Sequence, residues 1–325
     1  MWRTIVTLSV IATALLPVAA ARAQTPVAPA PAAAPAQTQM ALEVQRAGGA
    51  RATVLSGSRV RVRGATPAFA PNETVTVRFY IAGRKRFARR VALRPAADGT
   101  GAILLSYRPR RPGTMIATAT HAASPALAAF TAKSRSIDVI PRRVTPRSGA
   151  ASIRALQRRL RRMGYVTGSP GAFDARTARA VLAFRKVTGM ARTTSASPAV
   201  MRAIARGAGH YRIRFPSHGR HIEADLSRQV IALIEGGRVR RIYPVSTGAP
   251  STPTVLGSFK VYSTTPGTNA LGMVHSAYFH RGYATHGYAS VPTYPASHGC
   301  LRVPIPDALS LFRWIRIGTP VDVYP

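Results

Sequence analysis

The hydrophobic periodicity of the chain changes twice, and these changes indicate several domains rather than one. Apolar and polar residues alternate with period two from about residue 41 to residue 140, most clearly over 59–63, 74–79 and 115–119. Turn-forming Asp-Gly and Pro-Gly pairs separate the runs, a pattern typical of short antiparallel strands. Residues 41–140 are therefore predicted to form an immunoglobulin-like β-sandwich.

A helical period follows this region. Residues 141–149 are predicted to be a linker, and the apolar residues beyond them recur every three or four positions. The apolar face of the first helix consists of Ile153, Leu156, Leu160 and Met163. Asp174 is a suitable N-cap for a second helix, and a third helix is expected over residues 199–205. Residues 150–208 are thus predicted to form a small three-helix bundle.

Strand-like patterns return in the remainder of the chain. They cover residues 221–226, 229–234, 239–245, 259–262 and 321–324. One amphipathic helix is expected from Pro306 to about Ile315. The sequence therefore predicts that residues 209–325 form a mainly β domain with one late helix.

The N-terminal residues have the pattern of an export signal. Arg3 precedes an apolar stretch that ends in an Ala-Arg-Ala site, so residues 1–23 are predicted to be a signal peptide. Residues 24–40 are rich in Ala and Pro and are predicted to be a linker. We expect an exported protein of the cell wall, periplasm or extracellular space, with no transmembrane span after signal cleavage. An uncleaved membrane anchor is the alternative at this point.

The chain is strongly basic, with a formal net charge of +36. Residues 51–250 carry 38 Lys and Arg against 7 Asp and Glu, whereas residues 251–325 carry 5 against 2. In a cytoplasmic protein this charge would suggest nucleic acid, but an exported protein meets anionic envelope polymers and lipid headgroups instead. We expect no nucleic-acid partner. A general bias toward arginine explains the charge equally well.

Cys300 is the only cysteine, so an exported chain has a free thiol or an intermolecular disulfide. It lies in a polar, glycine-containing segment with two histidines nearby. A thiol needs a base to become a nucleophile at neutral pH. His298 would share a strand face with Cys300, and His286 lies far enough upstream to come from a neighbouring strand. Gly299 allows a sharp turn with exposed N–H groups, as an oxyanion site requires.

Two other interpretations of this segment remain open, and a third is excluded. Cys300 could be a buried small hydrophobic residue. Alternatively, His286, His298 and Cys300 could bind zinc with His275 or His280 as a fourth ligand, although no acidic residue is close in the sequence. A peptidase with an early Cys and a later His is excluded, because no histidine follows Cys300.

Two segments resemble known families. His286-Gly287 followed by Ser297-His298-Gly299-Cys300-Leu301-Arg302 is similar to the motif of the YkuD-type L,D-transpeptidase catalytic domain, and this resemblance covers about residues 215–325. Residues 150–208 resemble the three-helix peptidoglycan-binding domain. That family usually has an Asp-Gly pair after the first helix, where this chain has Ser169-Pro170-Gly171.

The first resemblance implies a set of roles and no cofactor or metal. Cys300 is the nucleophile, and His286 is the base, oriented by the backbone. His298 and the amides of Gly299 and Cys300 polarise the substrate carbonyl, and Ser297 positions His298. Arg302 and Gly287 are expected to bind substrate.

The implied partners are two peptidoglycan stem peptides, a donor and an acceptor, which the enzyme would join in a 3→3 cross-link. Hydrolysis of the same acyl-enzyme would make the protein an L,D-carboxypeptidase. A non-catalytic wall-binding protein is a third hypothesis. Only ten residues separate His286 from Ser297, fewer than in many members, so a loop over the cleft is expected to be short.

Overall fold

The computed structural model describes residues 40–46 and 53–325. The predicted signal peptide and residues 24–39 of the predicted N-terminal linker lie outside the described residues. Met40, the last residue of that linker, is only 7% exposed and packs with the core of the first domain. Met40 therefore belongs to the first domain and not to the predicted linker.

Two sheets form the predicted β-sandwich. The first has the order β1 (Ala41–Arg46), β3 (Val60–Thr66), β7 (Gly101–Tyr107) and β6 (Arg94–Pro95). The second has the order β2 (Thr53–Leu55), β10 (Ile137–Ile140), β8 (Gly113–His121), β4 (Thr74–Ile81) and β5 (Arg84–Ala92), with β9 (Phe130–Lys133) paired to β8.

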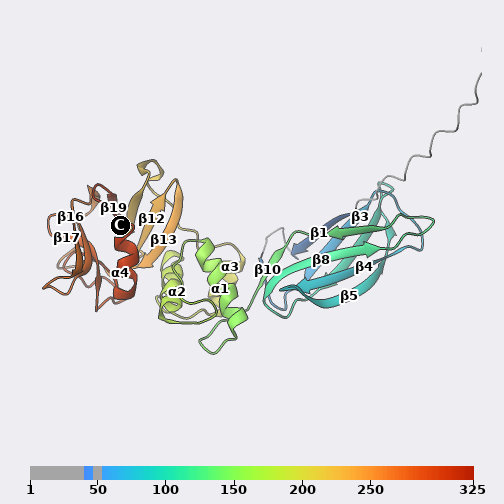
Figure 1. The fold of residues 1–325 in the computed structure, drawn as a ribbon, viewed down its shortest axis with the longest axis horizontal. Helices are drawn as coiled ribbons and strands as arrows, with labels where there is room; N and C mark the ends of the chain where they lie inside the picture. The colour runs from blue at the N-terminus through green and yellow to red at the C-terminus, as the bar shows by residue number, and fades with distance from the viewer. Residues whose placement is uncertain (1–39, 47–52) are drawn as a thin grey trace, which may run out of the picture. The chain divides into compact units, whose positions relative to one another are not determined.

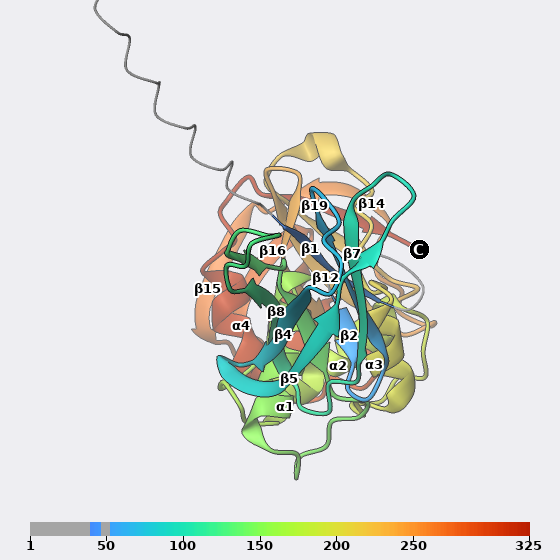
Figure 2. The same cartoon turned by 90° about the vertical axis from the view of Figure 1, so that its right-hand side faces the viewer.

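Burial alternates along these strands, because successive side chains point to opposite faces of a sheet. In β3 every second residue from Val60 to Thr66 is buried. Strands β4 and β5 pair antiparallel and lie side by side in both views (Figures 1 and 2). Strand β5 is the edge of its sheet, and most of its residues are exposed, including Arg84, Lys85, Arg86, Arg89 and Arg90.

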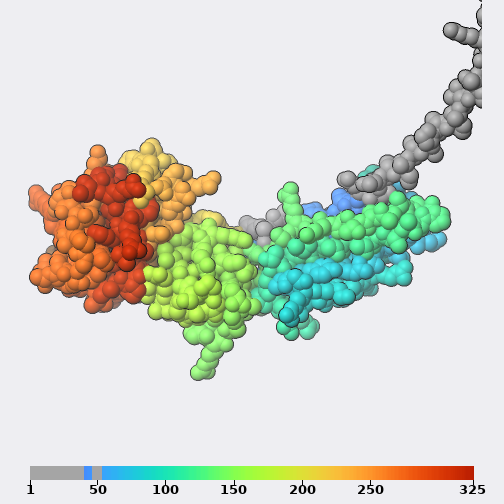
Figure 3. All heavy atoms as spheres, in the orientation of Figure 1, coloured from blue at the N-terminus to red at the C-terminus, as the bar shows by residue number. Residues whose placement is uncertain are grey.

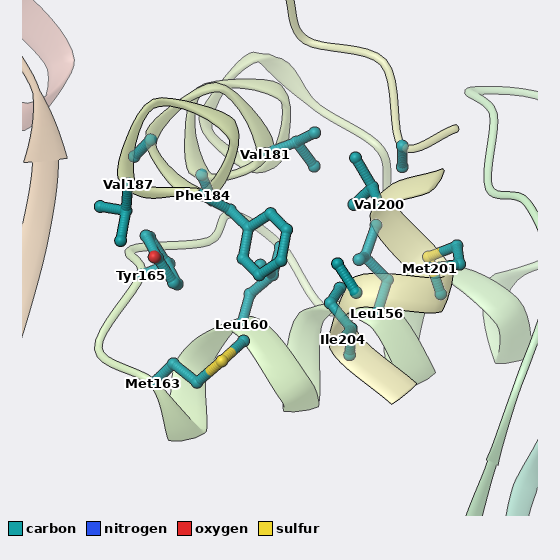
Figure 4. Packing of buried hydrophobic residues seen from close by; sticks show 14 of the residues in the cluster. Leu156, Leu160, Met163, Tyr165, Val181, Phe184, Val187, Val200, Met201 and Ile204 are labelled. Carbon is teal, nitrogen blue, oxygen red and sulfur yellow. The ribbon is translucent and has the colours of Figure 1, made fainter. Parts of the chain in front are cut away.

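Three helices follow, as predicted: α1 (Ala150–Arg162), α2 (Ala175–Val187) and α3 (Pro198–Ala205). Asp174 caps α2 by accepting a hydrogen bond from the amide of Thr177 at 2.8 Å. Figure 4 shows the ring of Phe184 lying among apolar side chains of all three helices. Its centroid is 5.7 Å from that of Tyr165, in an edge-on arrangement.

The predicted linker 141–149 is mostly exposed, but its middle is anchored to the helical module. Val144 is 2% exposed, belongs to the core of the helical module, and forms a bridge with Ala196. Its amide donates to the Ala196 carbonyl at 3.1 Å. The sequence prediction missed this contact because a single apolar residue has no period.

The C-terminal domain is mainly β, as predicted, and consists of two further sheets. One has the order β13 (Arg238–Pro244), β12 (Val230–Glu235), β11 (His221–Asp225), β19 (Pro320–Tyr324) and β14 (Gly257–Lys260). The other has the order β15 (Ser263–Thr268), β16 (Val274–His280), β17 (Tyr283–Tyr288) and β18 (Leu301–Pro304). A short 3-10 turn, η1 (Pro216–His218), precedes β11.

The late helix α4 (Ile305–Phe312) is shorter than predicted. Trp314 and Ile315 remain buried, but the backbone turns after Phe312 toward β19. Helix α4 packs against β17 (Figure 1), and part of its outer side is visible at the surface in Figure 3. Leu309 of this helix is 40% exposed. Within the described residues, no helix is both long and apolar enough to cross a membrane.

Strand β12 has both faces covered. Val230, Ala232 and Ile234 belong to the same apolar cluster as the three helices. Ile231 and Leu233 point the other way and join the cluster that includes α4. The core of the helical module therefore continues onto the first sheet of the C-terminal domain.

Candidate active site

The predicted base lies on one of two adjacent parallel strands, and the predicted nucleophile directly precedes the other. Strands β17 and β18 pair in parallel, with His286 opposite Arg302. Cys300 directly precedes β18, two residues before Arg302. The pairing therefore brings Cys300 beside β17, where the Ala284 amide, two residues before His286, donates toward its sulfur.

The segment around Cys300 is a turn, as Gly299 was expected to allow, and it is not the extended strand that would put His298 and Cys300 on one face. Residues 298–300 are bends, and Gly299 has a φ of +108°. A Cβ on Gly299 would lie 2.1 Å from Cε1 of Tyr283. Both the backbone conformation and the overlying ring therefore require glycine at this position.

The hydroxyl of Ser297 closes this turn. It accepts a hydrogen bond from the Gly299 amide at 3.1 Å and donates to the Cys300 carbonyl at 2.7 Å. Ser297 is 1% exposed, so water has little access to the groups that these hydrogen bonds join. The Gly299 amide thus already has a partner, which leaves the Cys300 amide as the available donor of the predicted pair. Ser297 holds the backbone, whereas the resemblance had implied that it positions His298.

The sulfur of Cys300 faces backbone polar groups. Its thiol points to the Gly282 carbonyl at 3.8 Å, and the Ala284 amide donates toward the sulfur. Burial raises the pKa of the Cys300 thiol, and this effect outweighs the Ala284 amide and the nearby charge of Arg302, which both lower it. Cys300 is half-buried. Because its pKa is raised, the resting thiol is protonated at neutral pH.

His286 is 2% exposed and is oriented by its own strand. Its Nδ1 lies 2.9 Å from the Gly287 carbonyl, which can only accept, so Nδ1 carries the proton and Nε2 has a free lone pair. Burial lowers the pKa of the imidazole; the Gly287 carbonyl raises it and Arg302 lowers it further. Between described residues no hydrogen bond joins His286 to Cys300. Both pKa directions favour a neutral thiol–imidazole pair over an ion pair.

The other predicted residues occupy different environments. The side chain of His298 is exposed. Arg302 donates to the Ala296 carbonyl at 3.2 Å, and its guanidinium lies 4.2 Å over the ring of Tyr288. Gly287 is buried against α4, where an added Cβ would lie 2.6 Å from that of Ala308. Gly287 therefore permits close packing of α4 and orients His286, and it does not present a surface to substrate.

His275 and His280, the possible fourth ligands of the zinc hypothesis, contact other groups. His275 accepts from the Gly267 amide at 3.1 Å and packs near Phe312. His280 packs against the ring of Phe259. Residues 40–46 and 53–325 contain no group of three or more His, Cys, Asp or Glu that could hold a metal ion.

One supporting segment was missed as part of the site. Residues 246–248 bridge to the strand and the turn, through Ser246 to Arg302 and through Gly248 to Ser297. The Thr247 carbonyl accepts from the amides of Ala296 and Ser297 at 2.8 and 2.9 Å. A Ser-Thr-Gly sequence directly after a predicted strand is the signal that could have pointed to this support.

Two family models match parts of this chain. Residues 219–323 match the YkuD family, described as the L,D-transpeptidase catalytic domain, and residues 149–204 match the PG_binding_1 family of peptidoglycan binding domains. No curated protein matches the chain.

Several solved structures are similar. The L,D-transpeptidase of Xylanimonas cellulosilytica DSM 15894 is 33% identical, over 56% of this chain and 97% of that one, with a TM-score of 0.51. An L,D-transpeptidase of Stackebrandtia nassauensis is 19% identical over 53% and 90% of the two chains, with a TM-score of 0.36. The catalytic domain of the Enterococcus faecium L,D-transpeptidase is 27% identical over 33% and 98%, with a TM-score of 0.29. With its catalytic-domain match and a 33% identical relative covered almost completely, this chain belongs to the L,D-transpeptidase family.

Proposed function

We propose that the protein is an exported L,D-transpeptidase that forms a thioester between Cys300 and a peptidoglycan stem peptide. Its catalytic and peptidoglycan-binding domains indicate action on peptidoglycan. The observation that supports the proposal is the pairing of β17 with β18, because the backbone-oriented imidazole lies on β17 and the only thiol of the chain directly precedes β18.

The first half-reaction acylates the thiol. The Cys300 sulfur attacks the carbonyl between the third and fourth residues of a tetrapeptide stem while its proton passes to Nε2 of His286. The oxyanion that forms is stabilised by the Cys300 amide and by His298. Collapse of the tetrahedral intermediate breaks the peptide bond, and His286 returns the proton to the leaving D-alanine amine. The neutral resting pair suits this sequence, because proton transfer accompanies attack.

The second half-reaction consumes the thioester. The side-chain amine of a second stem attacks the acyl carbon, the Cys300 thiolate leaves and regains a proton, and a 3→3 cross-link forms. Arg302 retains N–H groups beyond its bond to Ala296 and supplies a positive charge for a substrate carboxylate. Attack by water would yield a tripeptide and make the enzyme an L,D-carboxypeptidase.

Intact-protein mass spectrometry after incubation with a carbapenem, a thiol-reactive β-lactam, tests the proposal. We expect a single covalent adduct on the wild-type protein and none on Cys300→Ala. An adduct that persists on the Ala variant would reject Cys300 as nucleophile, and a wild-type protein without an adduct would favour the non-catalytic wall-binding hypothesis. Products from a tetrapeptide donor then separate the two reactions: a cross-linked dimer indicates transpeptidation, and a tripeptide alone indicates carboxypeptidation.

A further inference from the structure

One buried cation of the helical module contacts the C-terminal domain instead of an acidic partner. Lys186, near the end of α2, is 3% exposed. Its Nζ donates to the carbonyls of Gln229 at 3.0 Å and Val245 at 2.8 Å, which lie 43 and 59 residues further along the chain. Burial, followed by the nearby charge of Arg192, lowers the pKa of Lys186 to about 7. A group this costly to bury needs a structural reason.

The first acceptor, Gln229, is a strained residue. Its φ is +56°, in the left-handed region that is unfavourable for a residue with a side chain. Such a conformation costs about 1–3 kcal/mol and persists only where surrounding contacts determine it. The Gln229 carbonyl accepts from Lys186 and from the Val245 amide, and Gln229 is 1% exposed. Lys186 therefore helps to hold Gln229 in place.

Gln229 in turn fixes Thr247 from both sides. Its Nε2 donates to the Thr247 hydroxyl at 2.5 Å, and its Oε1 accepts from the Thr247 amide at 3.1 Å. The Thr247 carbonyl then accepts from the amides of Ala296 and Ser297. From Ser297, the hydroxyl bonds described above reach Gly299 and Cys300.

We propose that Lys186 is a positioning residue for the catalytic turn, residues 297–300. The helical module thus helps to position the residues of the active site. The connection runs from Lys186 through Gln229 and Thr247 to Ser297. Every step is a hydrogen bond between buried groups, where lost partners are not readily replaced by water. The inference rests on the proposed function of Cys300 and adds a dependence of its acylation on the helical module.

The neighbouring residue provides a matched control. Arg185 is also a buried cation of α2, but its guanidinium donates to the carbonyls of Ala191 and Ser195, which belong to the helical module itself. Lys186→Met and Arg185→Met therefore each remove a buried cation and its bonds to backbone carbonyls. Only the first change removes a link to the catalytic turn. Thr247→Val weakens the same link at its middle, because it removes the hydroxyl bond to Gln229 and keeps the bonds of the Thr247 backbone, and it leaves Lys186 intact.

The full-length variants are compared by three measurements: the rate of acylation by a carbapenem, the rate of Cys300 alkylation by iodoacetamide, and amide hydrogen exchange. For Lys186→Met and Thr247→Val we expect acylation to fall about tenfold, because misplacement of a reacting group by about 1 Å costs up to 10²-fold. Alkylation needs the thiolate and no oxyanion donor, so it should change less than about twofold. The amides of Ala296 and Ser297 should exchange at least about tenfold faster. Arg185→Met should leave all three unchanged.

Each outcome decides the proposal. Equal effects of Lys186→Met and Arg185→Met would show a general loss of stability and overturn it, as would a Lys186→Met protein with unchanged acylation and exchange. If Lys186→Met does not fold, Thr247→Val and Arg185→Met make the same comparison. If the wild-type protein is not acylated, the proposed function has failed, and the exchange data alone decide whether Lys186 holds the turn.

Discussion

Nδ1 of His286 lies 2.9 Å from the carbonyl oxygen of Gly287, the next residue of the same strand. This hydrogen bond fixes the tautomer and the ring orientation of His286, as the carboxylate does for the histidine of a Ser-His-Asp triad. A neutral carbonyl stabilises the imidazolium less than a carboxylate does. Burial, with a further contribution from the charge of Arg302, lowers the pKa of His286, and the Gly287 carbonyl offsets this only in part.

The pH dependence of acylation should reflect that lowered pKa. Protonated His286 cannot accept the thiol proton, so the rate falls as the pH decreases through the pKa of His286. Because burial lowers this pKa from its ordinary value of 6.5, we expect the acid limb below pH 6.5. The measurement is the second-order rate of carbapenem acylation between pH 4.5 and 8. An acid limb centred above pH 7 would contradict the assignment.

Replacement of the base should give a distinct pH profile. His286→Ala should lower acylation at neutral pH by about 10²–10⁴-fold. The rate should recover partly at alkaline pH, where the Cys300 thiol, whose pKa is raised by burial, ionises without help. His298→Ala serves as the comparison and should slow acylation without alkaline recovery. If the recovery appears in His298→Ala instead, the two roles are exchanged.

Gly299→Ala should damage both stability and activity. The new Cβ would overlap the Tyr283 ring, and the positive φ adds strain of about 1–3 kcal/mol. We expect a lower melting temperature and at least about tenfold slower acylation. Gly282→Ala is the control, because a Cβ there meets nothing within 4 Å. Equal losses in both variants would show that the segment tolerates no alanine for reasons unrelated to this contact.

Removal of the Ser297 hydroxyl should loosen the turn. Ser297→Ala leaves the Gly299 amide and the Cys300 carbonyl without their partner, which costs about 1–3 kcal/mol. Acylation should slow about tenfold. Ser310→Ala also removes a hydroxyl with two bonds, to Asp307 and Tyr243, and should keep the wild-type rate. Wild-type acylation by Ser297→Ala would show that the turn is held without this hydroxyl.

The stability of the protein should rise with pH above neutrality because of Lys186. Its pKa falls from an ordinary 10.5 to about 7 on folding, so between these values the unfolded chain holds more protons than the folded one. The free energy of unfolding then increases with pH, by up to about 1.4 kcal/mol per unit for this group. Unfolding between pH 7 and 9 should show this slope in the wild type and in Arg185→Met, and a flatter one in Lys186→Met. An unchanged slope in Lys186→Met would assign the effect to other groups.

Attachment to the wall should be ionic. Replacing the five exposed Lys and Arg of β5 by Gln should weaken retention on isolated cell walls and reduce its salt dependence. For the wild-type protein, sedimentation with walls should fall steeply as salt shortens the Debye length to about 8 Å. If neither salt nor the substitutions change retention, the high arginine content is a compositional bias. The arginines of β5 would then serve to protect an edge strand from pairing with other chains.

Much of the architecture follows from local patterns. The period-two runs predicted the strands of the first domain, and Asp174 marked the start of α2 because an N-cap needs only nearby residues. Cys300 and His286 stood out because glycine and histidine accompany the only thiol. Each of these signals lies within a short segment of the chain.

The connection between modules could not be predicted in this way. In the sequence, Lys186 is one cation among many, and its acceptors are backbone carbonyls, which every residue has. The packing on the two faces of β12 could not be predicted either, because an apolar strand does not indicate which elements cover each face. The sequence therefore suggested a separable domain 209–325, whereas Val230, Ala232 and Ile234 share their core with the helices.

This shared core also bears on how such a protein can be inherited and redesigned. If the helices and β12 complete one another, the two modules cannot be exchanged between relatives as independent cassettes. A chimaera carrying foreign helices would need a lysine aimed at Gln229 and Val245, together with apolar side chains shaped to Val230, Ala232 and Ile234. Selection is then expected to act on the helices and the catalytic sheet as one unit, with compensating changes on both sides of their boundary.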